Sequence, residues 1–184
     1  MGIFVGLTGP NASGKGEAAA CLEGLGFRRH SLADVVRREA ARRGLDPGRE
    51  NLIRIGNEMR AAEGWGVLAR RILPDLGGRD VIDSIRHPAE VEVLRSLDRF
   101  LLLAIEAPVE MRFDRTRRRA RPGDALTLEE FRRTEDREVS GTASGSQRIA
   151  ECIRVADARV CNDGGLDRFH RRIRQALAAA GMLL

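Results

Sequence analysis

The chain has 184 residues, of which 42% are hydrophobic and 32% are charged, a balance typical of a soluble globular protein and not of a disordered chain. Its longest apolar run, residues 100–105, is too short to cross a bilayer, and residues 1–20 show no signal-peptide pattern, so we expect a soluble, cytosolic protein. The formal net charge is +5, but acidic residues are interspersed with basic ones and aromatic residues make up only 4%, which argues against nucleic-acid binding.

Short apolar runs alternate with longer amphipathic stretches. In chain order, the pattern predicts a strand at 3–7, a helix at 17–25, a strand at 27–31 and helices at 34–43, 51–63 and 66–73. A strand at 81–83, a helix at 88–97, an interior strand at 100–105, a helix from 108 and a helix at 128–139 follow, then a strand at 158–161 and a helix at 167–179. This alternation predicts a three-layer α/β fold, a parallel sheet of about five strands flanked by helices, as one domain over residues 1–184.

A glycine-rich segment follows the first expected strand with the spacing G-x-x-x-x-G-K of a phosphate-binding loop. Its residues are Gly9, Pro10, Asn11, Ala12, Ser13, Gly14, Lys15 and Gly16. Glycines let backbone N–H groups turn toward a phosphate chain, and the helix that follows adds partial positive charge. Of the 32 basic residues, 31 are arginine and Lys15 is the single lysine. A compact ammonium suits the β- and γ-phosphates better than a guanidinium, so the loop predicts ATP binding and a P-loop NTPase fold.

The residue after such a lysine is usually Ser or Thr, whose hydroxyl binds Mg²⁺, but here Gly16 and Glu17 follow. This run resembles the Gly-Lys-Gly-Thr form of adenylate-kinase-like enzymes, with glutamate in place of threonine. A carboxylate there would repel a triphosphate unless Mg²⁺ or an arginine intervenes. We expect Glu17 to lie toward the phosphates, and the alternatives are pairing with a lid arginine or a simple helix-capping charge.

Asp83 ends an expected buried strand, and a carboxylate at that end reaches the crevice where the phosphate loop lies. The segment from Asp83 to Arg86 resembles the Asp-Gly-x-x-Arg segment of nucleoside monophosphate kinases. The resemblance implies that Asp83 holds Mg²⁺ through water and that Arg86 binds the phosphate of the acceptor. His87 precedes a proline and is expected to be structural.

Asp34 and Arg37 match the Thr-Gly-Asp-x-x-Arg segment with which adenylate kinases hold the monophosphate, although the Thr and Gly are replaced. The resemblance implies catalytic and acceptor-binding roles for Asp34 and acceptor binding for Arg37. Arg60 lies on the next helical pair and would complete the acceptor pocket. Helices of about residues 32–73 would then form the part that binds the acceptor.

Arginine occupies six of the ten positions from 112 to 121. Placed after the interior strand, this run resembles the short lid of the same kinases, at about residues 115–127, whose arginines neutralise the transferring phosphoryl group. The candidates are Arg115 at the nucleotide, Arg119 and Arg121 in catalysis, and Arg137 at the acceptor. The turn after the last strand resembles one that lies against the nucleotide base in dephospho-coenzyme A kinases, and its residues are Asn162, Asp163 and Gly164.

Together these segments resemble the P-loop nucleoside monophosphate kinase superfamily, on its dephospho-coenzyme A kinase and adenylate-kinase-related side. They are most similar to the kinase-like domain found alone or ahead of deoxycytidylate deaminases, and the His-x-Glu and Pro-Cys-x-x-Cys motifs of a deaminase are absent. The resemblance implies ATP and Mg²⁺ as cofactors and transfer to a small nucleotide-like acceptor.

A (deoxy)nucleoside monophosphate is the first candidate for this acceptor, and dephospho-coenzyme A is the alternative. In a different class, the chain would bind nucleotides as a sensor without turnover, which Glu17 and the missing hydroxyl favour. The arginine run and Asp83 favour the enzyme. The oligomeric state stays open.

Overall fold

The computed structural model describes residues 2–119, 127–139 and 148–183. Its centre is a five-stranded parallel sheet in the order β2-β3-β1-β4-β5. The strands are β1 (Ile3–Thr8), β2 (Arg28–Ser31), β3 (Arg79–Asp83), β4 (Phe100–Glu106) and β5 (Ala158–Cys161). The strands expected from the sequence are all present, and β4 lies in the interior between β1 and β5 as its apolar run predicts.

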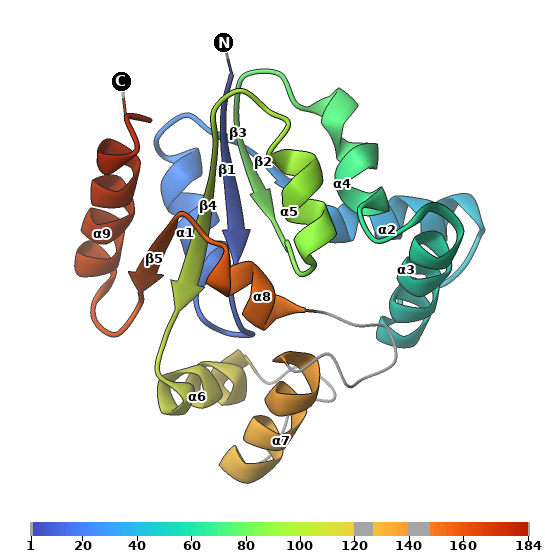
Figure 1. The fold of residues 1–184 in the computed structure, drawn as a ribbon. Coiled ribbons are helices and arrows are strands. Elements are labelled where there is room, and N and C mark those ends of the chain that lie inside the picture. The colour runs from blue at the N-terminus through green and yellow to red at the C-terminus, as the bar shows by residue number, and fades with distance from the viewer. Residues whose placement is uncertain (1, 120–126, 140–147, 184) are drawn as a thin grey trace.

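Helices cover both faces of this sheet (Figure 1). Those before β4 are α1 (Lys15–Glu23), α2 (Leu32–Arg42), α3 (Arg49–Glu63), α4 (Val67–Ile72), the 3-10 turn η1 (Leu73–Asp75) and α5 (Pro88–Leu94). Those after it are α6 (Val109–Arg119), α7 (Leu128–Val139), α8 (Ile149–Arg154) and α9 (Leu166–Ala179). Helix α8 was not predicted from the sequence. None of the described helices is long and apolar enough to cross a membrane.

Alternating strand residues divide the core into two layers. Val5 and Leu7 of β1 and Leu103 of β4 pack with α1 and α9 on one face. Phe4 and Leu102, one position away, point to the other face, where side chains of α2, α3, α4, α5 and α8 cover them. This period of two is what a strand buried on both faces requires. The three-layer α/β prediction is therefore confirmed.

Several candidate residues lie at the end of the sheet where the carboxyl ends of the strands meet. β1 lies between β3 and β4. The chain passes from β1 to β2 on one side of the sheet and from β3 past β1 to β4 on the other, so the strand order reverses between β3 and β1. Ligands of open parallel sheets bind beyond the carboxyl ends of the strands at this point. Helices α6 and α7 lie beyond that end of the sheet (Figure 1), and the segments after β1, β3 and β5 begin there.

Candidate functional site

The loop between β1 and α1 needs glycine at two positions. Gly9 and Gly14 have φ angles of 134° and 108°, which L side chains rarely adopt. A Cβ atom on Gly9 would lie 2.1 Å from the carbonyl oxygen of Ile105, and one on Gly14 would lie 2.2 Å from Nδ2 of Asn162. The spacing of the motif is therefore a requirement of this backbone.

Lys15 begins α1 and its side chain returns over the loop. Its Nζ donates hydrogen bonds to the carbonyl oxygens of Gly9 and Pro10, both at 2.8 Å. The loop thus holds a cation beside the N-terminus of a helix, and both features attract anions. Ser13 Oγ is buried in the same loop and has no hydrogen-bond partner among the described residues. Glycines, lysine and helix terminus together fit a phosphate chain.

The side chain of Glu17 has a partner that the sequence did not suggest. Its Oε1 lies 2.7 Å from Nε2 of His170, on α9. The carboxylate therefore faces α9. The sequence analysis had expected it to lie toward the phosphates or to pair with a lid arginine. A Cβ on Gly16 would meet no atom within 4 Å, so this position has room for the hydroxyl side chain that the sequence lacks.

Arg115, on α6, connects the loop with the turn after β5. Its guanidinium donates to the carbonyl oxygens of Ala12 and Ser13 at 3.3 Å and of Asn162 at 3.0 Å. Nδ2 of the buried Asn162 also donates to the carbonyl oxygen of Ser13, at 3.0 Å. Three segments that are far apart in the sequence thus meet at the loop.

Of the other residues expected near the lid and the turn, some contact the phosphate loop and others do not. Nη1 of Arg119 lies 3.4 Å from Oδ1 of Asn11, within the loop. Asp163 instead accepts a hydrogen bond from Arg172 of α9 at 2.6 Å, and this guanidinium lowers the pKa of the carboxyl. Gly164 continues the turn. Arg121 and much of the expected lid lie outside the described residues, as does the side chain of Arg137.

Asp83 lies at the carboxyl end of β3 with its side chain 10% exposed. Its Oδ2 accepts a hydrogen bond from Arg29 at 3.0 Å, and its Oδ1 accepts one from the backbone N–H of Ser84 at 2.6 Å. Sequence reasoning missed Arg29, because nothing in its surroundings on β2 distinguishes it from Arg28. The described residues contain no group of three or more His, Cys, Asp or Glu that could hold a metal.

The segment after β3 is tied to β1. Ile85 donates its N–H to the carbonyl oxygen of Leu7 at 3.3 Å, and Thr8 Oγ1 donates to the carbonyl oxygen of Ile85 at 3.0 Å. Arg86, which is expected to bind the acceptor, follows directly, so its backbone begins close to the end of β1, where the phosphate loop starts.

Glu90, at the start of α5, organises this neighbourhood. Its Oε2 accepts hydrogen bonds from the backbone N–H groups of Arg86 at 2.8 Å and His87 at 3.1 Å. Its Oε1 lies 3.6 Å from Nη2 of Arg60 on α3, and burial raises the pKa of its carboxyl. His87 caps α5, because its Nδ1 accepts the N–H of Ala89 at 3.1 Å. This agrees with the structural role expected for His87.

Asp34 and Arg37 pair with each other at 2.5 Å on α2, and both side chains are more than half exposed. Trp65, which the sequence analysis did not select, stacks on the ring of His87 with centroids 4.8 Å apart. The single tryptophan of a chain without tyrosine, placed between two glycines, was the sequence signal that could have found it.

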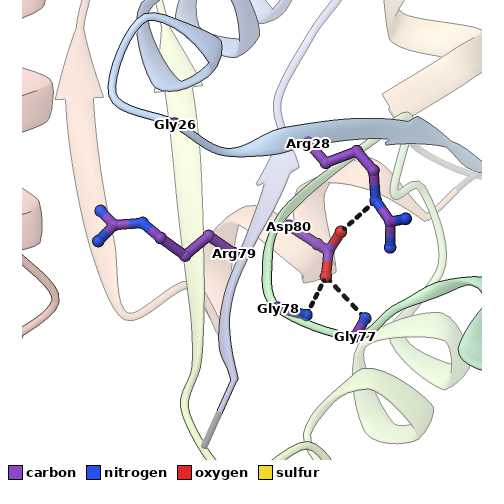
Figure 2. Close-up of a pocket in the computed structure, with 6 residues that line it drawn as sticks. All are labelled: Gly26, Arg28, Gly77, Gly78, Arg79 and Asp80. Carbon is purple, nitrogen blue, oxygen red and sulfur yellow. Dashed lines mark hydrogen bonds and ion pairs between the residues drawn. The ribbon is translucent and has the colours of Figure 1, made fainter.

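A hollow lies at the opposite edge of the sheet, where β2 and β3 begin (Figure 2). Its lining residues are Gly26, Arg28, Gly77, Gly78, Arg79 and Asp80. The buried carboxylate of Asp80 accepts the N–H groups of Gly77 and Gly78 at 2.9 Å and Nε of Arg28 at 3.0 Å. These contacts satisfy the carboxylate within the fold, and the hollow is remote from the phosphate loop.

Known proteins place the chain in a family. A UPF0200 protein of Methanothrix thermoacetophila is 39% identical over 177 residues, which cover 95% of this chain and 96% of that protein. This chain belongs to the UPF0200 family. The UPF0200/UPF0201 protein of Archaeoglobus fulgidus is 38% identical over 181 residues. The match covers 94% of the present chain but only 54% of the Archaeoglobus protein, so the chain spans about half the length of that relative. No protein-family model matches the chain.

Solved structures share the fold of this UPF0200 member. TT1252 from Thermus thermophilus has a TM-score of 0.64 at 24% identity, with 97% of each chain covered. A shikimate kinase from Acinetobacter baumannii has a TM-score of 0.64 at 18% identity and covers 97% of this chain and 94% of its own. The fold is therefore the P-loop fold that shikimate kinases share, as the sequence predicted.

Proposed function

We propose that this protein is a P-loop kinase that transfers the γ-phosphoryl group of ATP to a small nucleotide-like acceptor, first a (deoxy)nucleoside monophosphate. The observation that carries the proposal is the meeting of three segments at Arg115, which binds both the phosphate loop and the turn at Asn162. A nucleotide held by the loop would lie next to cationic groups of α6. A loop that only binds a nucleotide does not need these additional cations, whereas phosphoryl transfer does.

Each group has a part in this reaction that follows from its charge and place. Lys15 and the N-terminus of α1 bind the phosphates, and Arg115 and Arg119 approach the loop from α6. Charge that develops on the transferring phosphoryl group is stabilised by such fixed cations. Arg86 and Arg60, near the segment after β3, would bind the anionic group of the acceptor. Arg121 is a further candidate for catalysis. Arg137 and the pair Asp34 and Arg37 are further candidates for the acceptor side, with Asp34 also a candidate for catalysis.

The site fits Mg²⁺ that is bound mainly by the phosphates of the nucleotide. Because the described residues offer no three-ligand cluster, the ion would be held by phosphate oxygens and water, with Asp83 as the carboxylate that orders the water. Bound in this way, Mg²⁺ neutralises phosphate charge. Asp83 would have to share its carboxylate with Arg29, which now lies 3.0 Å from it.

The contact between Glu17 and His170 supports an enzyme over a nucleotide sensor. Glu17 and the missing hydroxyl after Lys15 were the two features that favoured the sensor. The carboxylate of Glu17 lies against α9, so its repulsion of the phosphates no longer counts for the sensor, while the missing hydroxyl still does. Fold neighbours include shikimate kinases and a gluconokinase, so small acids are the competing acceptors within the same reaction class. Dephospho-coenzyme A is a further competing acceptor of the same reaction.

An acceptor screen tests the proposal. The full chain is incubated with Mg-ATP and, separately, with dCMP, AMP, dephospho-coenzyme A, shikimate or gluconate, and both ADP and the phosphorylated product are measured. We expect stoichiometric ADP and product with a nucleoside monophosphate and none with Lys15→Met. ATP binding without turnover on any acceptor would favour the sensor, and a product from shikimate or gluconate would overturn the choice of acceptor.

A further inference from the structure

Trp65 is the one tryptophan of a chain that has no tyrosine. It lies between α3 and α4, flanked by Gly64 and Gly66, and 43% of its surface is exposed. Tryptophan is enriched where proteins contact a partner, because its ring offers a large apolar surface and a polar N–H. One side of the indole is nevertheless occupied, because the ring of His87 stacks on it with an interplanar angle of 11°.

The stack rests on a rigid support. His87 is 5% exposed and is fixed at both its Nδ1 and its backbone N–H, by Ala89 and Glu90. Gly66 lies tightly against α5, since a Cβ there would be 2.9 Å from Cγ2 of Val93. Burial and the neighbouring guanidinium groups lower the pKa of His87, so its ring is neutral at pH 7. The indole is therefore positioned before any ligand arrives.

Two guanidinium groups from different parts of the chain lie near this stack, together with the carboxylates of Glu92 and Glu151. Arg60 of α3 and Arg148, which precedes α8, both act electrostatically on His87. Arg148 also donates its backbone N–H to the carbonyl oxygen of Arg86 at 2.8 Å, and its side chain pairs with Glu151. The flat apolar surface of Trp65 lies on a ring that Arg60 and Arg148 approach. This combination suits a ligand that carries a planar ring and an anionic group.

We propose that the exposed surface of Trp65 binds the planar base of the acceptor and makes the site selective for nucleotides over acids without an aromatic ring. The inference rests on the proposed kinase function and specifies its substrate class. The arginines alone would accept a sugar phosphate or a carboxylate as readily as a nucleotide. Base stacking on an aromatic side chain would raise the affinity for a nucleotide by about tenfold or more.

Intrinsic fluorescence tests the inference directly, because all tryptophan emission comes from Trp65. The full chain is titrated with dCMP and AMP, with ribose 5-phosphate as the control that has a phosphate and no base. We expect saturable quenching by a nucleotide and none by ribose 5-phosphate. Nucleotide binding seen by calorimetry without any change in emission would overturn the inference.

Two substitutions separate stacking from a structural role. Trp65→Leu is expected to raise the KM for the nucleoside monophosphate at least tenfold, with the affinities for ATP and ribose 5-phosphate unchanged, and Trp65→Phe should restore most of the loss. Leu166→Ala removes another exposed apolar side chain, on α9, and should change none of these values. An unchanged KM in Trp65→Leu, or equal losses for all three ligands, would overturn the inference. Failure of wild-type protein to bind ATP would instead refute the proposed kinase function.

Discussion

Replacing the single lysine tests the donor half of the site. Nζ of Lys15 donates to the carbonyl oxygens of Gly9 and Pro10, both at 2.8 Å. With ATP bound, we expect the ammonium to exchange a loop carbonyl for a phosphate oxygen. A hydrogen bond to a charged group contributes about 1.5–3 kcal/mol, so Lys15→Met should weaken ATP binding roughly 10- to 150-fold. Transfer activity should fall further, because the contact strengthens as charge develops in the transition state.

Calorimetry on the full chain measures this loss of affinity. Lys15→Arg keeps the charge but replaces the compact ammonium by a broad guanidinium, and we expect it to recover affinity only in part. Arg133→Met is the matched control, since Arg133 is exposed and pairs with Glu129 along α7. The two lost loop hydrogen bonds should lower the melting temperature by about 2–8 °C without unfolding the protein. Equal ATP affinity in wild type, Lys15→Met and Arg133→Met would refute the assignment of the loop.

Three further substitutions test the acceptor side and the unusual glutamate. Arg86→Ala should raise the KM of the acceptor in steady-state assays while ATP affinity stays the same, and a loss confined to ATP would reverse the two sites. His87→Asn keeps a cap on α5 but removes a ring whose folded-state pKa lies below the ordinary 6.5. Wild-type stability from this ring is present above pH 6.5 and is lost as the pH falls through the folded pKa, so thermal melts between pH 7 and 5 should be flatter for the variant. Glu17→Thr breaks a partly exposed side-chain hydrogen bond with His170, so it should cost less than about 1 kcal/mol and leave Mg-ATP affinity unchanged. Tighter Mg-ATP binding would show that the carboxylate repels the phosphates.

The fold and the phosphate loop could be predicted because their signals are local. A strand, two glycines and a lysine lie within 15 residues, and the nearly uninterrupted apolar runs of β1 and β4 predict strands that are covered on both faces, as they are. Gly9 and Gly14 have the positive φ angles that the motif spacing requires. Helix α8 was missed because only two of its six residues, Ile149 and Cys152, are buried, too few for a helical period to stand out. Helix α4 has the same length but buries four residues, and it was predicted.

Contacts between distant parts of the chain could not be read in the same way. Arg29 and Asp83 are 54 positions apart, and Glu17 and His170 are 153 apart. Their pairing depends on strand register and on where α9 packs, which one sequence does not specify. The resemblance to known kinases did select Arg115 and Asn162, which meet across 47 positions. For Trp65 no motif offered such help.

The two halves of the site differ in what builds them. The donor half consists largely of backbone groups of one loop, so its shape follows from the glycine positions and tolerates little change at Gly9 or Gly14. The proposed acceptor half would consist of side chains that several helices bring to the end of β3, and a loop of three residues, 64–66, carries the aromatic ring. A different side chain at Trp65 would then change the surface offered to an acceptor without moving a strand. On this proposal, acceptor specificity of the chain would lie in exchangeable side chains, while phosphate binding would lie in the backbone of a fold that it shares with a shikimate kinase and a gluconokinase.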